Sequence, residues 1–347
     1  MTKIVVCPDS FKGTLTSPEA AEAIRRGIMA VVSDVEIIIL PVGDGGEGTA
    51  DALAQVLPYS RERLVDTIDP LGRPIKARYF VVNQKTALIE SAAASGLVLL
   101  KSHERDIMRA DTRGTGRLIA DAYQSGIRNF IICMGGTVTC DAGYGAWKEM
   151  KELEMTDAEF TLLCDVENPL LGSEGAAVVF GPQKGATSED MPRLESLLTE
   201  KAEFYETLYG HSVKDASYGG AAGGLAAMLM ACFGAVPCRG IEKVLAILDF
   251  DEIIKDADLV ITGEGRVDST TLHGKAPRGI LEAAQRRGIP VAVIGGKIAD
   301  RPLLCEAGFY IIEQATPDRA NPITTPAEYV EKAASRIMKR LNGMQPD

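Results

Sequence analysis

Both ends of the 347-residue chain repeat one pattern: a short, continuous apolar run, a glycine- or aspartate-rich turn and an amphipathic helix. Apolar runs without polar interruption are typical of parallel strands that are buried on both faces. The pattern therefore predicts parallel sheet covered by helices, with Ser17 before Pro18 as the N-cap of the first helix. The predicted strands are 3–7, 36–42, 258–262, 291–295 and 308–313, and the predicted helices are 18–31, 49–56, 276–286 and 326–341.

The middle of the chain has a different pattern. Three strand-like segments, with the turn signal Asp-Pro-Leu-Gly at 69–72, predict a β-meander. We therefore expect two α/β domains, namely a flavodoxin-like parallel sheet formed by residues 1–65 and 250–347 and a mixed α/β domain inserted at 66–249. In the middle the predicted strands are 64–69, 75–82, 86–92, 129–134 and 160–165, and the predicted helices are 116–125 and 190–208.

The composition argues against several partners. The chain has 37 Lys and Arg against 48 Asp and Glu, a net charge of −11, so it repels nucleic acids and anionic membranes. The most apolar stretch, 219–237, is rich in glycine, which favours a close-packed helix over a membrane span. The seven cysteines are scattered and form no CxxC pair. We expect a cytoplasmic protein without disulfides or a zinc site, and a homodimer is compatible with the sequence.

Glycine-rich loops with acidic or basic residues follow most of the predicted strands. In open α/β sheets, ligands bind beyond the carboxyl ends of the strands, where such loops lead into helices. Glycines combined with carboxylates and cations are suited to a phosphate group and a divalent cation. The loops are 9–14, 43–49, 135–141, 165–169, 181–185 and 263–268.

Two nucleotide-binding patterns are not supported. The spacing of Gly43, Gly45 and Gly48 matches the dinucleotide fingerprint, but Asp44 and Glu47 would place two negative charges against a pyrophosphate. The Walker A pattern is absent, since no Gly-Lys pair has the required spacing and a following Ser or Thr. If the protein uses ATP, it does so without a P-loop.

The acids and bases of these loops have two interpretations. A carboxylate near a substrate hydroxyl can orient it, accept its proton or hold Mg²⁺ through water. Alternatively, an acid in a glycine-rich turn can simply cap a helix, and a lysine can simply be solvated. Asp44 and Glu47 share one loop with four glycines, and Glu264 and Asp268 flank Arg266 in another, so these loops favour the first interpretation.

Several blocks of the sequence carry a family resemblance. The chain reads Cys-Pro-Asp-Ser-Phe-Lys-Gly-Thr at 7–14, Gly-Asp-Gly-Gly-Glu-Gly-Thr at 43–49 and Ile-Thr-Gly-Glu-Gly-Arg-Val-Asp at 261–268. Further blocks lie at 90–97, 112–116, 164–170, 180–186, 219–224 and 272–277. Together, in this order and over almost the whole chain, they resemble the type 1 glycerate kinase family.

The resemblance implies ATP-dependent phosphorylation of D-glycerate, usually at the 2-hydroxyl in this family, giving 2-phosphoglycerate with Mg²⁺ assistance. It also implies two α/β domains with the active site in the cleft between them. Two alternatives remain open. A kinase for another small hydroxy acid would use the same loops, and an α/β protein can bind a sugar acid or nucleotide without turnover.

The sequence departs from the family pattern in two places. The family usually reads Gly-Gly-Ser-Ala-Thr-Asn-Asp-Gly-Gly at 135–143, where this chain has Thr137, Val138, Cys140 and Ala142. The segment after Gly145, up to residue 160, is a few dozen residues shorter than usual. Either this stretch is deleted, or a disordered part is missing from the sequence.

For phosphoryl transfer, the protein mainly positions groups and offsets charge. Asp44 is the first choice for orienting and deprotonating the glycerate hydroxyl, followed by Asp268. Lys12 and Arg266 are the candidates for the substrate carboxylate and the transferring phosphate. The predicted catalytic residues are Asp44, Asp268 and Lys12; the substrate contacts Asp9, Ser10, Arg266 and Glu264; the nucleotide contacts Lys184, Gln183, Lys275, Gly45 and Gly46; and the Mg²⁺ ligands Glu47 and Asp165.

Overall fold

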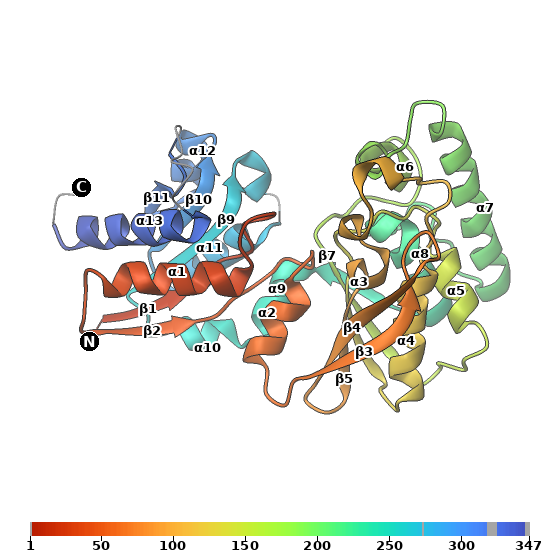
Figure 1. Ribbon diagram of the computed structural model, residues 1–347, viewed down its shortest axis with the longest axis horizontal. Coiled ribbons are helices and arrows are strands. Elements are labelled where there is room, and N and C mark those ends of the chain that lie inside the picture. Colours follow the sequence, from red (N-terminus) through yellow and green to blue (C-terminus); the bar gives the residue numbers. More distant parts are fainter. Residues whose placement is uncertain (1, 273, 318–324, 344–347) are drawn as a thin grey trace. The chain divides into compact units, whose positions relative to one another are not determined.

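The computed structural model describes residues 2–272, 274–317 and 325–343. The chain forms two compact units, Met1–Asp44 with Ile241–Asp347, and Gly45–Gly240. In Figure 1 the red and blue ends of the chain build the first unit, and the orange to green middle builds the second. The chain passes from one unit to the other at 44/45 and at 240/241. The sequence predicted these limits at 65/66 and 249/250, in both cases too far along the chain.

The described part of the first unit holds a five-stranded sheet in the order β11-β10-β9-β1-β2, with every recorded pair parallel. When these five strands are numbered 1 to 5 in chain order and the sheet is read from the β2 edge, the order is 2-1-3-4-5. This is the strand order of flavodoxin-like folds. The prediction of a flavodoxin-like parallel sheet built from both ends of the chain is therefore confirmed. The strands are β1 (Thr2–Val6), β2 (Val35–Ile39), β9 (Leu259–Val267), β10 (Val291–Ile298) and β11 (Ile311–Gln314).

Strand β9 is longer than the sequence predicts. Instead of ending at residue 262 it continues to Val267, and it pairs with β10 as far as Ile298. Gly263 permits this extension, because a Cβ at this position would lie 2.4 Å from the carbonyl oxygen of Ile294. Glu264 and Arg266, which the sequence places in a loop, therefore lie on a strand.

Helices cover both faces of the first sheet. On one face, α1 (Ser17–Met29) packs against α13 (Pro326–Leu341) and over the strands (Figure 1). Thr16 caps α1 instead of the predicted Ser17, whose hydroxyl donates to the carbonyl of Pro8 at 2.7 Å. The apolar side of α11 (Ala276–Arg286) is also buried, but its residues do not belong to the apolar core under α1 and α13. Helix α11 therefore covers the other face of the sheet. The shorter elements are α9 (Gly240–Ile247), α10 (Phe250–Ile254), α12 (Arg301–Ala307) and the 3₁₀ helix η5 (Ser269–Leu272).

The described part of the second unit holds a six-stranded mixed sheet in the order β3-β4-β5-β6-β7-β8. Strands β3, β4 and β5 form the predicted antiparallel meander, and β5 to β8 run parallel. The predicted turn at 69–72 joins β3 to β4, where Asp69 accepts hydrogen bonds from the N–H groups of Leu71 and Arg73. The strands are β3 (Arg61–Ile68), β4 (Pro74–Val82), β5 (Thr86–Glu90), β6 (Asn129–Cys133), β7 (Glu159–Cys164) and β8 (Val236–Arg239), the last of which the sequence did not predict.

The most apolar helix of the second unit, α8 (Leu225–Phe233), is almost entirely buried in its core. Close backbone contact at Gly223 makes this packing possible, because a Cβ there would lie 1.9 Å from the carbonyl oxygen of Thr139. No helix within the described residues is long and apolar enough to cross a membrane. The other helices of this unit are α2 (Thr49–Val56), α3 (Ala92–Ser95), α4 (Arg113–Gln124), α5 (Tyr144–Met150), α6 (Ala176–Phe180), α7 (Met191–Tyr209) and the 3₁₀ turns η1 (Leu97–Leu99), η2 (Ser102–Glu104), η3 (Pro182–Lys184) and η4 (Ala221–Gly224).

Candidate active site

The loop after β1 carries the first predicted site residues. Asp9 is buried, and its N–H donates to the carbonyl of Gly263 at 2.8 Å, which ties this loop to β9. The Asp9 carboxylate accepts a hydrogen bond from the N–H of Ser10 at 2.6 Å. Residues 11–15 then form a tight turn that leaves Lys12 exposed. The loop thus holds a buried carboxyl group and an exposed ammonium group close together.

Asp9, Asp44 and Glu264 are all buried in the first unit, at 5%, 4% and 6% exposure. Burial raises the pKa of Asp9 well above its ordinary value, and the negative charge of Asp44 raises it further. The hydrogen bond from Ser10 and the charge of Lys12 oppose this rise, and the charge of Glu264 adds to it. Asp9 therefore holds a proton more firmly than an exposed aspartate.

Glu264 on β9 lies among polar partners. The hydroxyl of Thr271 donates to Glu264 Oε1 at 2.5 Å, and Lys275 Nζ lies 3.6 Å from Oε2. Burial raises the pKa of Glu264, while the Thr271 hydrogen bond and the Lys275 charge lower it. The carboxylate therefore anchors Lys275 at the N-terminus of α11 beside the loop after β1.

Arg266 and Asp268 form a local pair. Arg266 Nε lies 2.9 Å from Asp268 Oδ2, and the arginine side chain is 71% exposed. Asp268 Oδ1 accepts hydrogen bonds from the N–H and hydroxyl of Thr270, and the hydroxyl bond is the leading cause of the lowered pKa of Asp268. These bonds stabilise the turn at η5, as expected if Asp268 has the structural role of capping a turn. Because its carboxylate is engaged in these bonds, Asp44 is favoured over Asp268 as the base.

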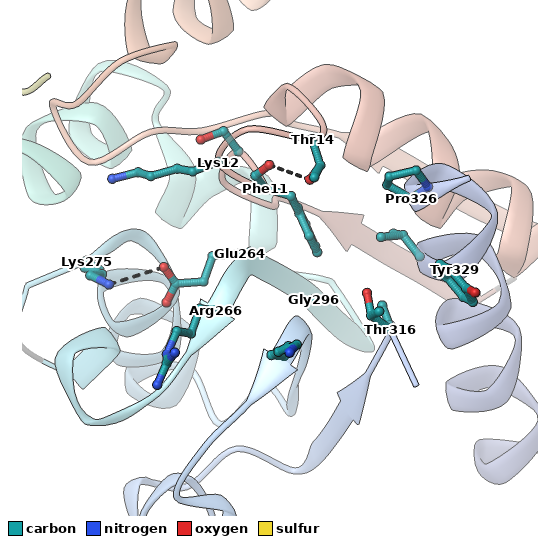
Figure 2. A pocket seen from close by; sticks show the side chains of 15 residues that line it. Phe11, Lys12, Thr14, Glu264, Arg266, Lys275, Gly296, Thr316, Pro326 and Tyr329 are labelled. Carbon is teal, nitrogen blue, oxygen red and sulfur yellow. Dashed lines mark hydrogen bonds and ion pairs between the residues drawn. The ribbon is translucent and has the colours of Figure 1, made fainter. Parts of the chain in front are cut away.

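A cavity of about 550 Å³ lies at the carboxyl ends of β1, β9, β10 and β11 in the first unit. Figure 2 shows Lys12, Glu264, Arg266 and Lys275 around it. Ser10 also lines the cavity, whereas Asp9, Asp44 and Asp268 are not among its described lining residues. In the first unit, eight predicted site residues either line this cavity or interact electrostatically with a residue that lines it. They are Asp9, Ser10, Lys12, Asp44, Glu264, Arg266, Asp268 and Lys275.

The remaining predicted residues lie in the second unit. Lys184 is buried, and its ammonium group donates to the carbonyl of Thr139 at 2.8 Å and to the hydroxyl of Thr137 at 3.2 Å. Burial lowers the pKa of Lys184, and nearby negative charges, including that of Asp165, oppose this shift. Gln183, the preceding residue, is exposed. Lys184 and Asp165 therefore lie near each other, on loops that are separate in sequence.

The glycines after Asp44 pack against the carboxyl ends of β6 and β7. Gly45 accepts a hydrogen bond from the N–H of Gly135 at 3.1 Å, and a Cβ on Gly45 would lie 2.6 Å from the carbonyl oxygen of Leu163. A Cβ on Gly135 would lie 2.6 Å from Gly46 Cα. Glu47 follows as an exposed side chain. These glycines allow close backbone contact, and they place Glu47 at the same sheet edge as the residue that follows β7, Asp165.

The described residues contain no group of three or more His, Cys, Asp or Glu side chains arranged to hold a metal ion. Mg²⁺ usually needs only one or two protein carboxylates, because waters and substrate phosphates supply its other ligands. Glu47 is exposed and Asp165 is half-buried, so both carboxylates suit contact with a hydrated ion. The residues present therefore fit a Mg²⁺ ion that arrives with a nucleotide.

Three polar residues of interest were not predicted from the sequence. Glu90 ends β5 and accepts a hydrogen bond from the N–H of Ala50 at 2.8 Å, at the start of α2. Asp141 accepts bonds from the Thr112 hydroxyl and from several N–H groups, which joins the loop after β6 to α4. Lys297 lines the cavity. Lys297 could have been found, because it follows two glycines at the end of a predicted strand.

Comparisons with known proteins agree with this arrangement. A model of the glycerate kinase family matches residues 4–157 and 148–342. The glycerate kinase of Bacillus subtilis strain 168 is 38% identical, and the alignment covers 96% of each chain. The glycerate 2-kinase of Escherichia coli K12 is 39% identical over 86% of each chain. The crystal structure of a candidate glycerate kinase 2 from Salmonella typhimurium LT2 superposes with a TM-score of 0.84, at 34% identity, and covers 99% of this chain and 98% of its own.

The shortened segment after Gly145 is fully described. Helix α5 ends at Met150, and residues 151–158 lead directly into β7. The two matches to the family model meet at 148–157, and the alignment with the Bacillus subtilis relative spans 372 positions, more than this chain contains. Strands β6 and β7, on either side of this segment, pair in register, so the sheet is intact here. By sequence over residues 4–342, and by fold, the chain belongs to the glycerate kinase family.

Proposed function

We propose that the protein transfers the γ-phosphoryl group of ATP to the 2-hydroxyl of D-glycerate, giving 2-phospho-D-glycerate and ADP. Membership of the glycerate kinase family makes the chain an enzyme that phosphorylates glycerate. The relative from Escherichia coli named glycerate 2-kinase supports the 2-hydroxyl as the acceptor. ATP is the donor that a kinase of this family implies.

One observation carries the assignment of roles. Buried Asp9 and Asp44 lie within electrostatic reach of Lys12 and Glu264, in the unit whose cavity lies at the carboxyl ends of parallel strands. The proposal keeps Asp44 as the acceptor for the proton of the substrate hydroxyl, because its buried carboxylate lies within electrostatic reach of both Asp9 and Glu264. Lys12 and Arg266 offset the charge of the transferring phosphoryl group and the glycerate carboxylate, and Lys275 contacts the nucleotide.

The transfer conserves atoms and charge in one displacement. The glycerate oxygen forms a bond to the γ-phosphorus as the bond from that phosphorus to the β-bridging oxygen breaks. The hydroxyl proton passes to Asp44, and ADP leaves. The proposal keeps Ser10 and Glu264 as contacts of the acceptor and Asp268 as the second choice of base.

For the second unit, the proposal keeps Gly45, Gly46, Gln183 and Lys184 as nucleotide contacts. Glu47 and Asp165 would hold Mg²⁺ through water, and the ion, when bound, neutralises charge on the β- and γ-phosphates. A cytoplasmic location and a homodimer remain predictions from the sequence.

Replacement of Asp44 by Asn tests the base. We expect kcat to fall by about 10²- to 10⁴-fold, because the amide cannot accept the hydroxyl proton. The exposed Asp34 of the same unit supplies the control, and Asp34→Asn should leave kcat unchanged. An unchanged rate in Asp44→Asn would remove this residue from the chemistry.

Phosphorus NMR of the product tests the reaction itself. With D-glycerate and ATP, we expect the signals of ADP and of a phosphate ester on carbon 2. An ester on carbon 3 would contradict the regiochemistry. A panel of other small hydroxy acids, followed by ADP release, separates a glycerate kinase from a kinase with another acceptor. Calorimetric binding of glycerate without ADP release would instead favour a binding protein.

A further inference from the structure

The cavity in the first unit is much larger than the acceptor requires. Its volume of about 550 Å³ is typical of sites for nucleotide-sized ligands, whereas a three-carbon acid would fill only a small part of it. The switch point of this sheet lies between β1 and β9, whose carboxyl ends both contribute to the cavity. Size and position therefore point to the larger of the two substrates.

Two cations lie side by side on neighbouring strands at this cavity. In the parallel ladder of β9 and β10, Arg266 pairs with Lys297, so both side chains leave the same face of the sheet. Both residues line the cavity, together with Lys12 and Lys275, and Glu264 is the one acidic side chain among its described lining residues. Like charges directly opposite each other destabilise a sheet. Asp268 already offsets the charge of Arg266, so an anion beside Lys297 would stabilise the rest of this pairing.

Part of the cavity lining is bare backbone, at positions that alternate along the strands with Arg266 and Lys297 and therefore face the other side of the sheet. Gly265 and Gly296 both line the cavity, on neighbouring strands. A Cβ on Gly296 would lie 2.5 Å from the carbonyl oxygen of Gly265, so this position requires glycine. The absence of side chains at this point lets a phosphate group approach the backbone closely.

The other end of the cavity is apolar. Figure 2 shows Lys12 and Lys275 on one side of the cavity and Pro326 and Tyr329 on the other. Val330 and Ala315 also contribute apolar surface. A tyrosine ring beside aliphatic side chains is suited to a flat heteroaromatic ring, which it can stack against or contact by its edge. The cavity thus has a cationic end and an aromatic end.

We propose that this cavity binds a nucleoside polyphosphate, with the base against Tyr329 and Pro326 and the phosphate chain along Lys297 toward Lys12 and Lys275. This inference rests on the proposed function in so far as ATP is the phosphoryl donor. It assigns Lys297 to the phosphate chain and Tyr329 to the base, and it brings the terminal phosphate to the end of the cavity where Lys12 lies.

The phosphate end is tested with Lys297→Ala. In calorimetric titration with ADP and no glycerate, we expect the Kd to rise roughly 10- to 100-fold, the range for loss of a charge-assisted contact. In assays, the KM for ATP should rise by a similar factor, while the KM for glycerate stays within about twofold. Lys332 of α13 is exposed and does not line the cavity, so Lys332→Ala is the matched control and should behave as wild type.

The base end is tested with inorganic tripolyphosphate as a second probe. Tyr329→Ala should weaken the binding of ADP but leave that of tripolyphosphate unchanged, whereas Lys297→Ala should weaken both. Tyr329→Phe keeps the ring and should retain ADP affinity. Thermal unfolding of each variant separates loss of binding from loss of folding, and a folded Tyr329→Ala protein with wild-type ADP affinity would overturn the assignment of the base.

Failure of this inference is distinguishable from failure of the proposed function. If Lys297→Ala raises the KM for glycerate and leaves that for ATP and the Kd for ADP unchanged, Lys297 contacts the acceptor and not the nucleotide. The inference is then wrong, although the enzyme is still a glycerate kinase. If wild type shows no turnover of D-glycerate, but Lys297→Ala still weakens ADP binding and Lys332→Ala does not, the proposed function fails and the nucleotide site stands.

Discussion

Among the single residues, the buried carboxyl groups have the clearest consequences. Glu90 ends β5 and accepts hydrogen bonds from the N–H groups of Ala50 and Gly48. Burial raises the pKa of Glu90 to about 7; the two N–H bonds oppose this rise, and the charges of Asp51 and Glu47 add to it. Glu90 therefore titrates near neutral pH, at the end of β5 and in contact with the N–H groups where the 43–49 loop leads into α2.

Glu90→Gln should change how the stability of the protein depends on pH. The folded state binds the Glu90 proton up to pH of about 7, whereas the unfolded chain releases it near its ordinary value of 4.5. Between these values the folded state holds more protons, so this group makes the free energy of unfolding fall as pH rises. Relative to wild type, the variant should therefore gain up to about 3 kcal/mol between pH 5 and pH 8, measured by urea unfolding.

A control for this effect lies in the same unit. The side chain of Glu152 is 84% exposed, so Glu152→Gln should differ from wild type by the same amount at both pH values. A difference between Glu90→Gln and wild type that does not change with pH would show that Glu90 is ionised throughout this range.

Thr271 is a second residue with a specific role. It is fully buried, its hydroxyl donates to Glu264 Oε1, and it accepts a hydrogen bond from the N–H of Asp268 at 3.0 Å. Thr271→Val keeps the shape of the side chain but removes its hydroxyl, so the Glu264 carboxylate and the Asp268 N–H each lose a hydrogen-bond partner. The free energy of unfolding should therefore fall by about 1–3 kcal/mol. Thr271→Ser retains the hydroxyl and should lose less. Equal losses in the two variants, measured by urea unfolding, would argue that packing and not the hydrogen bonds sets the stability there.

Among the elements, α1 and α13 pack closely against each other, and the sequence did not predict this contact. Gly27 of α1 faces α13, where a Cβ would lie 2.2 Å from the carbonyl oxygen of Glu331 and 2.8 Å from Ala334 Cβ. The hydroxyl of Ser335 donates to the Gly27 carbonyl at 2.9 Å across the same contact. The closeness of the two backbones therefore depends on this glycine.

Gly27→Ala should destabilise the protein, although alanine is the better helix former by about 1 kcal/mol. The added methyl group forces the two helices apart, and overpacking of this kind costs about 1–3 kcal/mol. Met29, which is 43% exposed near the end of the same helix, provides the control, and Met29→Ala should change the stability by about 0.5 kcal/mol or less. If Gly27→Ala raised the urea midpoint, helix propensity would outweigh the contact.

The elements also show where sequence patterns reach their limit. Continuous apolar runs located the strands of the first sheet, because burial on both faces selects such runs wherever they occur. The same rule missed β8, a four-residue edge strand that contains Pro237. It also ended β9 too early, since the pairing of Gly263 to Val267 depends on β10, which is distant in sequence.

For the whole molecule, the two units have separate apolar cores. Ile24 belongs to the core under α1 and α13, and Leu198 belongs to the core of the second unit. The described residues of these two clusters do not overlap, so the chain is expected to unfold in more than one step. This expectation is also the test of the predicted division into two domains.

Ile24→Ala and Leu198→Ala test the independence of these cores. Both side chains are fully buried, and each truncation should cost about 2–5 kcal/mol. In calorimetry, each variant should shift one of two overlapping transitions and leave the other in place. If both variants shifted the entire unfolding profile equally, the units would unfold as one cooperative body.

The sequence alone determined the alternation of strands and helices, the parallel sheet built from both ends of the chain and the glycine-rich loops that carry acids and bases. These features depend on local composition and spacing, which act the same way wherever a segment lies. Only the tertiary structure decided that Asp9 lies within reach of Asp44 and Glu264, and that Arg266 lies beside Lys297. Strand register and burial set these contacts, and both arise from pairing between segments far apart in the chain.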